Sequence, residues 1–150
     1  KATVATGLFE DVFVVTDSEI IFNEIVSHGG KAIMSKKEHE CGSDRIAEAV
    51  EFMDVDIVVN VQGDEPMMDP SVIDKVARAL HASPMSTAAT PIKNPDDYEN
   101  TNVNKVILNQ ASNAIYFSRR TIPCVREHLD RPIREQLQTF PFLKHLGVYG

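Results

Sequence analysis

DVFVVTDSEIIFNEIVSHGGKAIM, residues 11–34, is the stretch that decides the fold. Its first part, residues 11–15, is a short run rich in apolar and β-branched residues, which is typical of a strand. Thr16 and Glu19 have the T-x-x-E spacing of a capping box, so a helix is expected to begin there. The pattern therefore predicts a strand that leads directly into a helix.

The rest of this stretch predicts the end of the helix and a second strand. The apolar residues that would share one helical face are Ile21, Phe22, Ile25 and Val26. Gly29 and Gly30 tolerate a positive φ at a helix end, and Lys31–Met34 is short enough for a strand. A strand, a helix and a strand in this order indicate a βαβ unit.

The same alternation continues along the chain. Ser43 is expected to cap a helix, and residues 56–61 form a strand that is too apolar to have a solvated face, so helices should cover both of its faces. Asp69 and Pro70 begin another helix, because the first turn needs no N–H from proline. The inward faces of the two helices would carry Ile46, Ala49, Val50 and Met53, and Ile73, Val76, Ala77 and Leu80.

Later strands complete the predicted fold. They are expected at residues 87–92, 105–108 and 114–118. Some of them should pair antiparallel, because they follow one another without helices between them. Together the elements predict an α/β fold, an open and mainly parallel sheet with helices on both faces.

Composition narrows the function classes. The 150 residues, 43% of them hydrophobic, can bury one core, so we expect one domain over residues 1–150 that is incomplete at both ends. Fifteen basic against 22 acidic residues give a net charge of -7, which argues against nucleic-acid binding. Cys41 and Cys124 are too isolated for a zinc site or a disulfide. Without a run of about 20 apolar residues or a secretory signal, we expect a soluble, cytoplasmic protein with no membrane partner.

The first candidate site is VVNVQGDEPMM, residues 58–68. Residues 62–66 follow a strand, and ligands of open parallel sheets bind beyond the carboxyl ends of the strands. A carboxylate there can hold Mg²⁺, which takes one or two carboxylates and completes its shell with water and phosphate oxygens, so Asp64 is the predicted ligand. Gly63 would let the backbone approach a ligand closely, whereas Glu65 has no assigned role. A turn with solvated acids explains the same residues.

HECGSDR, residues 39–45, forms a second candidate at a strand-to-helix junction on the same edge. Its glycine and serine would present a backbone N–H and a hydroxyl to a base or sugar. The alternative is an ordinary helix N-terminus, with Arg45 paired to Glu48 or Glu51 on its own helix.

Basic and aromatic side chains near two later strands form the third candidate. His145 and Tyr149 flank an apolar run, and Arg119 and Arg120 follow a strand. A packed histidine and solvated arginines explain the same pattern. Walker A, GxGxxG and GxSxG motifs are absent from these residues, which argues against a P-loop ATPase, a dinucleotide oxidoreductase and an α/β-hydrolase.

Several segments, taken in order, resemble one known family. They are VFVVTD (12–17), HECGSDRIAEAV (39–50), VVNVQGDEPMM (58–68), YFSRRTIP (116–123) and HLGVYG (145–150). Over nearly its whole length the chain resembles the 3-deoxy-manno-octulosonate cytidylyltransferase (CMP-KDO synthetase) family. The resemblance implies a nucleotide-diphospho-sugar transferase-like fold and a Mg²⁺-dependent enzyme. Its reaction would join CTP and 3-deoxy-D-manno-octulosonate (KDO) to give CMP-KDO and pyrophosphate, for lipopolysaccharide biosynthesis, in a homodimer.

The resemblance also suggests roles for single residues. The catalytic residues would be Asp64, which would also hold the metal, and Gln62. The nucleotide-binding residues would be Cys41, Gly42, Ser43, Arg45 and Gly63. The substrate-binding residues would be Gln62, Arg119, His145 and Tyr149. The family more often has serine where Cys41 stands.

The family pattern extends beyond these 150 residues. It includes an N-terminal triphosphate loop and a C-terminal metal-binding aspartate that the sequence does not contain, so we expect the fragment alone to be inactive. Two other functions stay open at this point. One is a cytidylyltransferase for another sugar acid, such as sialic acid, and the other is a non-catalytic nucleotide-binding or interaction domain.

Overall fold

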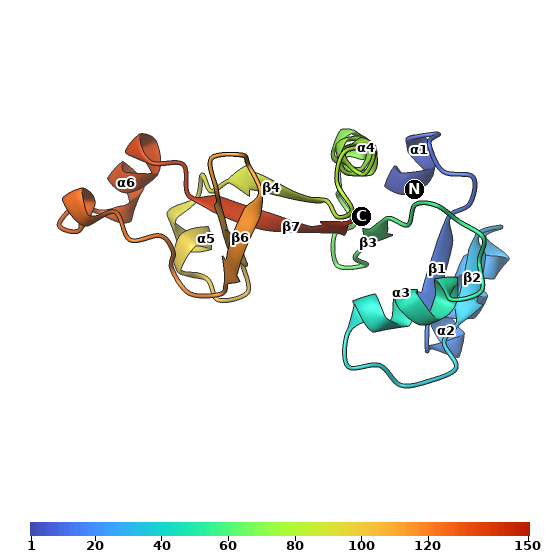
Figure 1. Ribbon diagram of the computed structural model, residues 1–150. Helices are drawn as coiled ribbons and strands as arrows, with labels where there is room; N and C mark the ends of the chain where they lie inside the picture. The colour runs from blue at the N-terminus through green and yellow to red at the C-terminus, as the bar shows by residue number, and fades with distance from the viewer. The chain divides into compact units, whose positions relative to one another are not determined.

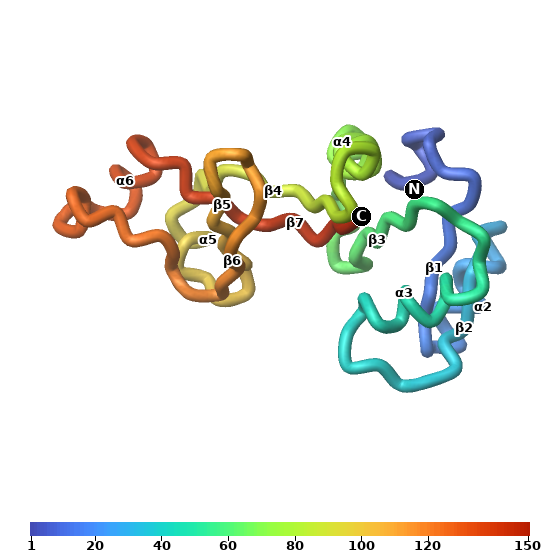
Figure 2. Tube along the Cα trace, in the orientation of Figure 1, coloured from blue at the N-terminus to red at the C-terminus, as the bar shows by residue number.

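The computed structural model describes all 150 residues (Figure 1), and Figure 2 traces the same chain as a tube. The chain divides into two compact units. The first contains Lys1–Ser86 and Gly147–Gly150, and the second contains Thr87–Leu146. The strand β7 (Leu143–Tyr149) begins in the second unit and ends in the first. The single domain expected over residues 1–150 stays a prediction.

The first unit contains the predicted βαβ stretch. Its elements are α1 (Ala2–Ala5), β1 (Phe13–Thr16), α2 (Glu19–Ser27), β2 (Lys31–Met34), α3 (Gly42–Val50), β3 (Asn60–Val61), α4 (Pro70–Ala79) and the end of β7. The strands β1 and β2 pair in parallel, with Phe13 opposite Lys31 and Thr16 opposite Met34. Helix α2 packs on both strands and α3 packs on β1. The strand, helix and strand are thus confirmed.

The predicted capping box at the start of α2 does not form. Thr16 stays the last residue of β1, and its hydroxyl accepts a hydrogen bond from the backbone N–H of Ser18 at 3.1 Å. Ser18 is the N-cap residue instead, without a side-chain cap. The strand holds Thr16 in extended backbone opposite Met34, so the helix begins later. Of the glycine pair predicted to tolerate a positive φ after this helix, Gly29 adopts one, with a φ of +74°.

The boundaries predicted around α3 are also corrected. Its N-cap is Cys41, so Ser43 lies inside the first turn, and Met53 lies beyond the last helical residue, Val50. The strand expected over residues 56–61 is reduced to Asn60–Val61.

That shortened strand is partly solvated, against the prediction of two covered faces. Only Asn60 and Val61 pair with β7, opposite Tyr149 and Val148. Ile57, just before them, is 38% exposed. An apolar run alone therefore did not establish a strand here, because strand residues also need a pairing partner.

Helix α4 follows its sequence signals. The Asp69 carboxylate accepts the backbone N–H of Ser71 at 2.8 Å, and Pro70 occupies the first turn. Ile73 and Val76 are 0% and 2% exposed, as the periodicity predicts. Burying each such side chain contributes about 1.5–3 kcal/mol.

The second unit is built around antiparallel strands. Its elements are β4 (Thr87–Pro91), α5 (Pro95–Glu99), β5 (Lys105–Leu108), β6 (Ala114–Ser118), η1 (Arg126–His128), α6 (Ile133–Thr139) and the start of β7. Strand β5 pairs antiparallel with β6 and with β7, and β4 also pairs with β7. The buried side chains are Ile92, Lys105, Val106 and Phe142. The strands predicted over residues 105–108 and 114–118 are confirmed.

The α/β class is confirmed, with mixed strand pairing. Strands β1 and β2 are parallel, whereas β3–β7, β5–β6 and β5–β7 are antiparallel. A short turn over residues 109–113 joins β5 to β6, and parallel neighbours would need a long crossover instead. No helix has the length and apolarity that crossing a membrane requires.

Candidate functional site

The QGDEP turn follows β3 in the first unit. The backbone N–H of Glu65 donates to the Gln62 carbonyl at 3.2 Å, and the N–H of Met68 donates to the Glu65 carbonyl at 3.1 Å. Two successive turns therefore bring Gln62, Gly63 and Asp64 to the end of a strand. The predicted placement of these residues beyond β3 is confirmed.

This turn is fastened to β7 at Gly147. The Gln62 N–H donates to the Gly147 carbonyl at 2.9 Å, and the Glu65 carboxylate accepts the Gly147 N–H at 3.3 Å. A Cβ atom at Gly147 would lie 3.0 Å from the Gln62 side-chain oxygen and 3.3 Å from Glu65 Cγ. In the structure Glu65, which had no predicted role, anchors the turn to Gly147.

Asp64 and Gly63 are exposed at the tip of the turn. Nothing lies within 4 Å of a Cβ built on Gly63, so its surroundings leave room for a close neighbour. Burial, and then the negative charge of Asp64, raise the pKa of Tyr149. The first unit therefore places the Tyr149 phenol within electrostatic range of Asp64.

The acids of the chain do not form a metal cage. No group of three or more His, Cys, Asp or Glu side chains could hold a metal ion. A single exposed carboxylate such as Asp64 fits a hard ion like Mg²⁺, which keeps several waters and takes substrate phosphates as ligands. It does not fit a site made of protein ligands alone.

The N-terminus of α3 is open to solvent. Cys41, Gly42 and Ser43 are all exposed, and the Cys41 side chain makes no capping hydrogen bond. Ser43 and Tyr149 line one open pocket of about 250 Å³ in the first unit. The other residues that line it are Ile46, Ala47, Val50, Val58, Asn60 and Gly150. The structure thus brings together one predicted nucleotide-binding residue and one predicted substrate-binding residue.

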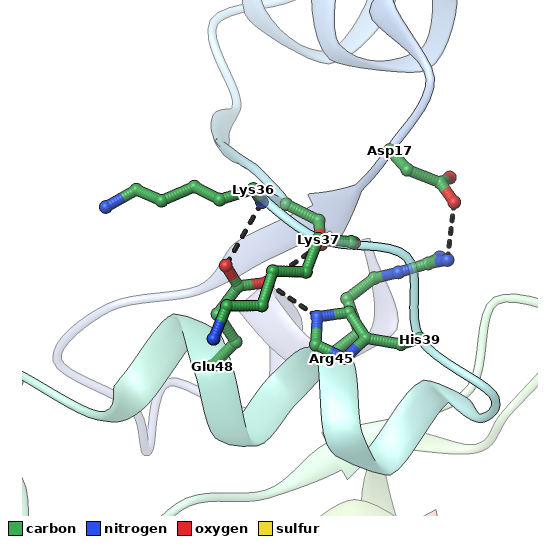
Figure 3. A network of polar contacts seen from close by, with 7 residues as sticks. Asp17, Lys36, Lys37, His39, Arg45 and Glu48 are labelled. Carbon is green, nitrogen blue, oxygen red and sulfur yellow. Dashed lines mark hydrogen bonds and ion pairs between the residues drawn. The ribbon is translucent and has the colours of Figure 1, made fainter.

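The ion-pair partner of Arg45 lies outside its own helix (Figure 3). Its Nη2 atom donates to the Asp17 carboxylate at 2.6 Å, so the alternative pairing with Glu48 or Glu51 is wrong. The Nε atom of Arg45 is buried without a hydrogen-bond partner. Because Asp17 directly follows β1, this ion pair ties α3 to the end of that strand.

Glu48 forms a network that sequence reasoning missed. Its carboxylate accepts the backbone N–H of Lys36 at 3.1 Å and lies 2.6 Å from His39 Nε2 and 2.9 Å from the Ser35 hydroxyl (Figure 3). These contacts, led by the His39 hydrogen bond, lower the pKa of Glu48 from 4.5 to about 2. The partners lie 9 to 13 residues away, outside helical spacing, so no local pattern could have indicated them.

Arg119, in the second unit, contacts backbone. Its Nη1 atom donates to the Thr101 carbonyl at 3.0 Å and to the Asn102 carbonyl at 3.4 Å. The Arg119 carbonyl accepts a hydrogen bond from the buried Lys105 Nζ at 3.1 Å. In this structure the Arg119 guanidinium therefore holds a loop.

His145 also belongs to the second unit. Its Nε2 atom lies 2.7 Å from the Thr87 hydroxyl, and its ring meets Phe117 edge to face at 5.1 Å. Its N–H donates to the Asn104 carbonyl at 2.8 Å. The candidate residues thus divide between the units: Arg119, Arg120 and His145 lie in the second unit, and the others lie in the first.

A family profile described as Cytidylyltransferase matches residues 1–150 of this chain. The chain belongs to the cytidylyltransferase family. Among similar members, the 3-deoxy-manno-octulosonate cytidylyltransferase of Flavobacterium johnsoniae is 49% identical over 155 residues, covering 100% of this chain and 60% of that protein. The protein of the same name from Christiangramia forsetii is 48% identical, covering 100% of this chain and 59% of that one. The chain spans about three-fifths of their length.

A solved structure extends the likeness to the fold. It is CMP:2-keto-3-deoxy-manno-octonic acid synthetase complexed with CTP, with a TM-score of 0.83 and 30% sequence identity. The match covers 99% of this chain and 58% of that one. The resemblance predicted from the ordered motifs, and the fold class that came with it, are confirmed.

Proposed function

We propose that the protein to which these residues belong is a 3-deoxy-manno-octulosonate cytidylyltransferase, which makes CMP-KDO and pyrophosphate from CTP and KDO. The observation that carries this proposal is the match of the whole chain to cytidylyltransferases of that name, at up to 49% identity. The likeness to a synthetase complexed with CTP supports the same nucleotide. The product would serve lipopolysaccharide synthesis in the cytoplasm, and the enzyme would act as a homodimer.

The reaction is a single displacement at phosphorus. The anomeric hydroxyl of KDO attacks the α-phosphorus of CTP, a new P–O bond forms, and the bond to pyrophosphate breaks while the hydroxyl proton leaves to solvent or a base. Positioning and neutralisation of charge supply most of the catalysis in such a step. Bound Mg²⁺ would neutralise charge on the phosphates, and Asp64 would be its ligand from these residues.

The candidate nucleotide-binding residues lie at the start of α3 and in the QGDEP turn. Cys41, Gly42 and Ser43 would face the base and ribose, since the first turn of a helix offers backbone N–H groups that have no intrahelical partner. Because Cys41 carries a thiol instead of the serine hydroxyl usual in the family, the hydroxyl contact would come from Ser43. Arg45 would act through its ion pair with Asp17, which holds α3 in place.

The sugar acid would bind near Gln62 and Tyr149 of the first unit. Support comes from the pocket that Tyr149 shares with Ser43, and from the influence of Asp64 on the Tyr149 pKa. The family resemblance also assigns His145, which precedes Tyr149 on the same strand, to substrate binding. Arg119 would orient the substrate through the loop that it holds.

The direct test measures pyrophosphate release by the full-length protein with CTP and Mg²⁺. We expect turnover with KDO and little with N-acetylneuraminate. Preference for N-acetylneuraminate would overturn the assignment of the sugar, and CTP binding without turnover of any sugar acid would favour the non-catalytic alternative. Residues 1–150 alone, which span about three-fifths of the relatives, are expected to be inactive.

A further inference from the structure

We propose that Glu48 is a positioning residue for CTP binding, because its carboxylate fastens residues 35–41 onto α3 beside the candidate nucleotide-binding residues. We call Glu48 with its partners Ser35, Lys36 and His39 the Glu48 latch. The inference rests on the proposed function, and it concerns how the nucleotide site is held in shape.

The latch links the end of β2, the segment that follows it and helix α3. The N–H of Ser35 donates to the Thr16 carbonyl at 2.8 Å, so the segment begins beside the ends of β1 and β2. Glu48, in the second half of α3, then holds Lys36 through its backbone and His39 through its ring. In Figure 3 the Glu48 carboxylate faces both of them, and the segment passes over the helix.

His39 is the part of residues 36–41 that packs against the protein. It is the only one of these residues that is not exposed, and its side chain is 11% exposed while that of Glu48 is 14% exposed. Removing Glu48 leaves the poorly solvated His39 ring without this hydrogen bond, and removing His39 takes one of three hydrogen-bond partners from the Glu48 carboxylate. The docking of the segment therefore depends on this pair.

Few other hydrogen bonds hold the segment. The Ser35 hydroxyl lies 2.9 Å from the Lys37 carbonyl and 2.9 Å from the Glu48 carboxylate, and its single proton can serve one of them at a time. Between Lys36 and Glu40, the remaining hydrogen bonds to the rest of the protein end on Glu48.

The segment lies at the edge of the sheet where a ligand is expected to bind. Residues 35–41 leave the carboxyl end of β2, which is parallel to β1, and open sheets of this kind bind ligands beyond the carboxyl ends of parallel strands. The segment ends at Cys41, the N-cap of α3. A docked segment spares CTP the entropy cost of ordering these residues, so the latch should act on CTP affinity more than on the chemical step.

The test compares full-length variants by CTP titration calorimetry and by steady-state kinetics with KDO. For Glu48→Ala and His39→Ala we expect the Kd and KM for CTP to rise about tenfold, with kcat within about twofold of the wild type. The two substitutions together should cost little more than Glu48→Ala alone, because Glu48→Ala already removes the contact with His39. Glu48→Gln keeps one accepting oxygen where the carboxylate uses two, so it can keep only part of the network and should restore part of the affinity.

Asp74→Ala is the matched control, since it removes an exposed ion pair with Arg78 on α4 of the same unit. It should leave the CTP affinity unchanged. Hydrogen exchange of residues 36–41 should accelerate most in Glu48→Ala, less in Glu48→Gln, and stay slow in Asp74→Ala, while the melting temperature shows that each variant is folded.

Three outcomes would overturn the latch: unchanged CTP affinity despite faster exchange, equal losses in Glu48→Ala and the control, or additive losses in the double variant. If Glu48→Ala does not fold, the CTP affinities of His39→Ala and Glu48→Gln decide the test. If the wild type binds no CTP, the proposed function and the latch fail together. If the wild type binds CTP and the variants bind it equally well, the latch alone fails.

Discussion

Asp64 shows what a single residue of the candidate site can do. Its carboxylate is exposed at the tip of the QGDEP turn, whose shape depends on Gln62 and Glu65. A substitution at Asp64 should therefore change chemistry without changing the fold. Glu65, one residue later, is turned toward Gly147 and anchors the same turn.

In the full-length protein we predict that Asp64→Asn lowers kcat by about 10²–10³-fold. A neutral amide would bind Mg²⁺ more weakly than the carboxylate does, and the metal would neutralise the charge that develops on the phosphates. The measurement is pyrophosphate release with saturating CTP, KDO and Mg²⁺. Asp56→Asn, at an exposed acid before β3, is the control and should retain wild-type turnover. Equal turnover and equal Mg²⁺ dependence in Asp64→Asn would remove Asp64 from the mechanism.

At the scale of elements, the junction of β2 with α3 combines electrostatics with loop docking. The pKa of Glu48 is lowered to about 2 by the hydrogen bond from His39 and by contacts with Ser35 and Lys36. A carboxyl whose pKa falls on folding stabilises the folded state above its unfolded pKa. This stabilisation is lost as the pH falls through the folded value.

We therefore predict that the gap in unfolding free energy between wild type and Glu48→Gln is constant above about pH 4.5 and shrinks as the pH falls toward about 2. Urea unfolding at a series of pH values measures it. Glu51→Gln, at the exposed C-terminal end of the same helix, is the control for an acid outside the latch. A gap that does not change with pH would show that Glu48 gains nothing from its partners.

Elements that depend on local signals could be predicted, and those that depend on distant partners could not. The start of α4 at Asp69 needs only a capping residue and a proline, so the local sequence was sufficient to predict it. The strand expected over residues 56–61 needed a partner strand, and β7 pairs with only its last two residues. The Arg45–Asp17 pair spans 28 residues, which no helical spacing indicates. The motifs thus indicated the segments of the candidate site, whereas the contacts that hold those segments are tertiary.

At the scale of the whole molecule, each unit is held together by contacts between residues distant in the sequence. In the second unit Lys105 is 0% exposed, and its ammonium donates to the carbonyls of Asn100, Val103 and Arg119. Burial, and then the charge of Arg119, lower the pKa of this lysine. In the first unit the closing contact is made by residues from the end of the chain, since Gly147–Gly150 return to pack with residues 1–86.

Gly147 is one position of this returning segment where an added side chain would meet close neighbours. We predict that Gly147→Ala costs about 1–3 kcal/mol of stability, because its Cβ would lie 3.0 Å from the Gln62 side-chain oxygen and 3.3 Å from Glu65 Cγ. Relieving this overlap moves the QGDEP turn, so turnover of the full-length protein should fall more than stability alone explains. Thermal melting and pyrophosphate release at a temperature where the variant stays folded separate the two effects.

Gly42→Ala is the stability control, because nothing lies within 4 Å of a Cβ at that position. A Gly147→Ala protein with wild-type melting and turnover would mean that the structure accommodates the added methyl group without moving the QGDEP turn. A loss of stability with unchanged turnover would mean that the turn keeps its catalytic shape without close packing on β7. Lower turnover in a folded Gly147→Ala protein, with normal melting of Gly42→Ala, would show that the end of β7 sets the position of Gln62 and Asp64.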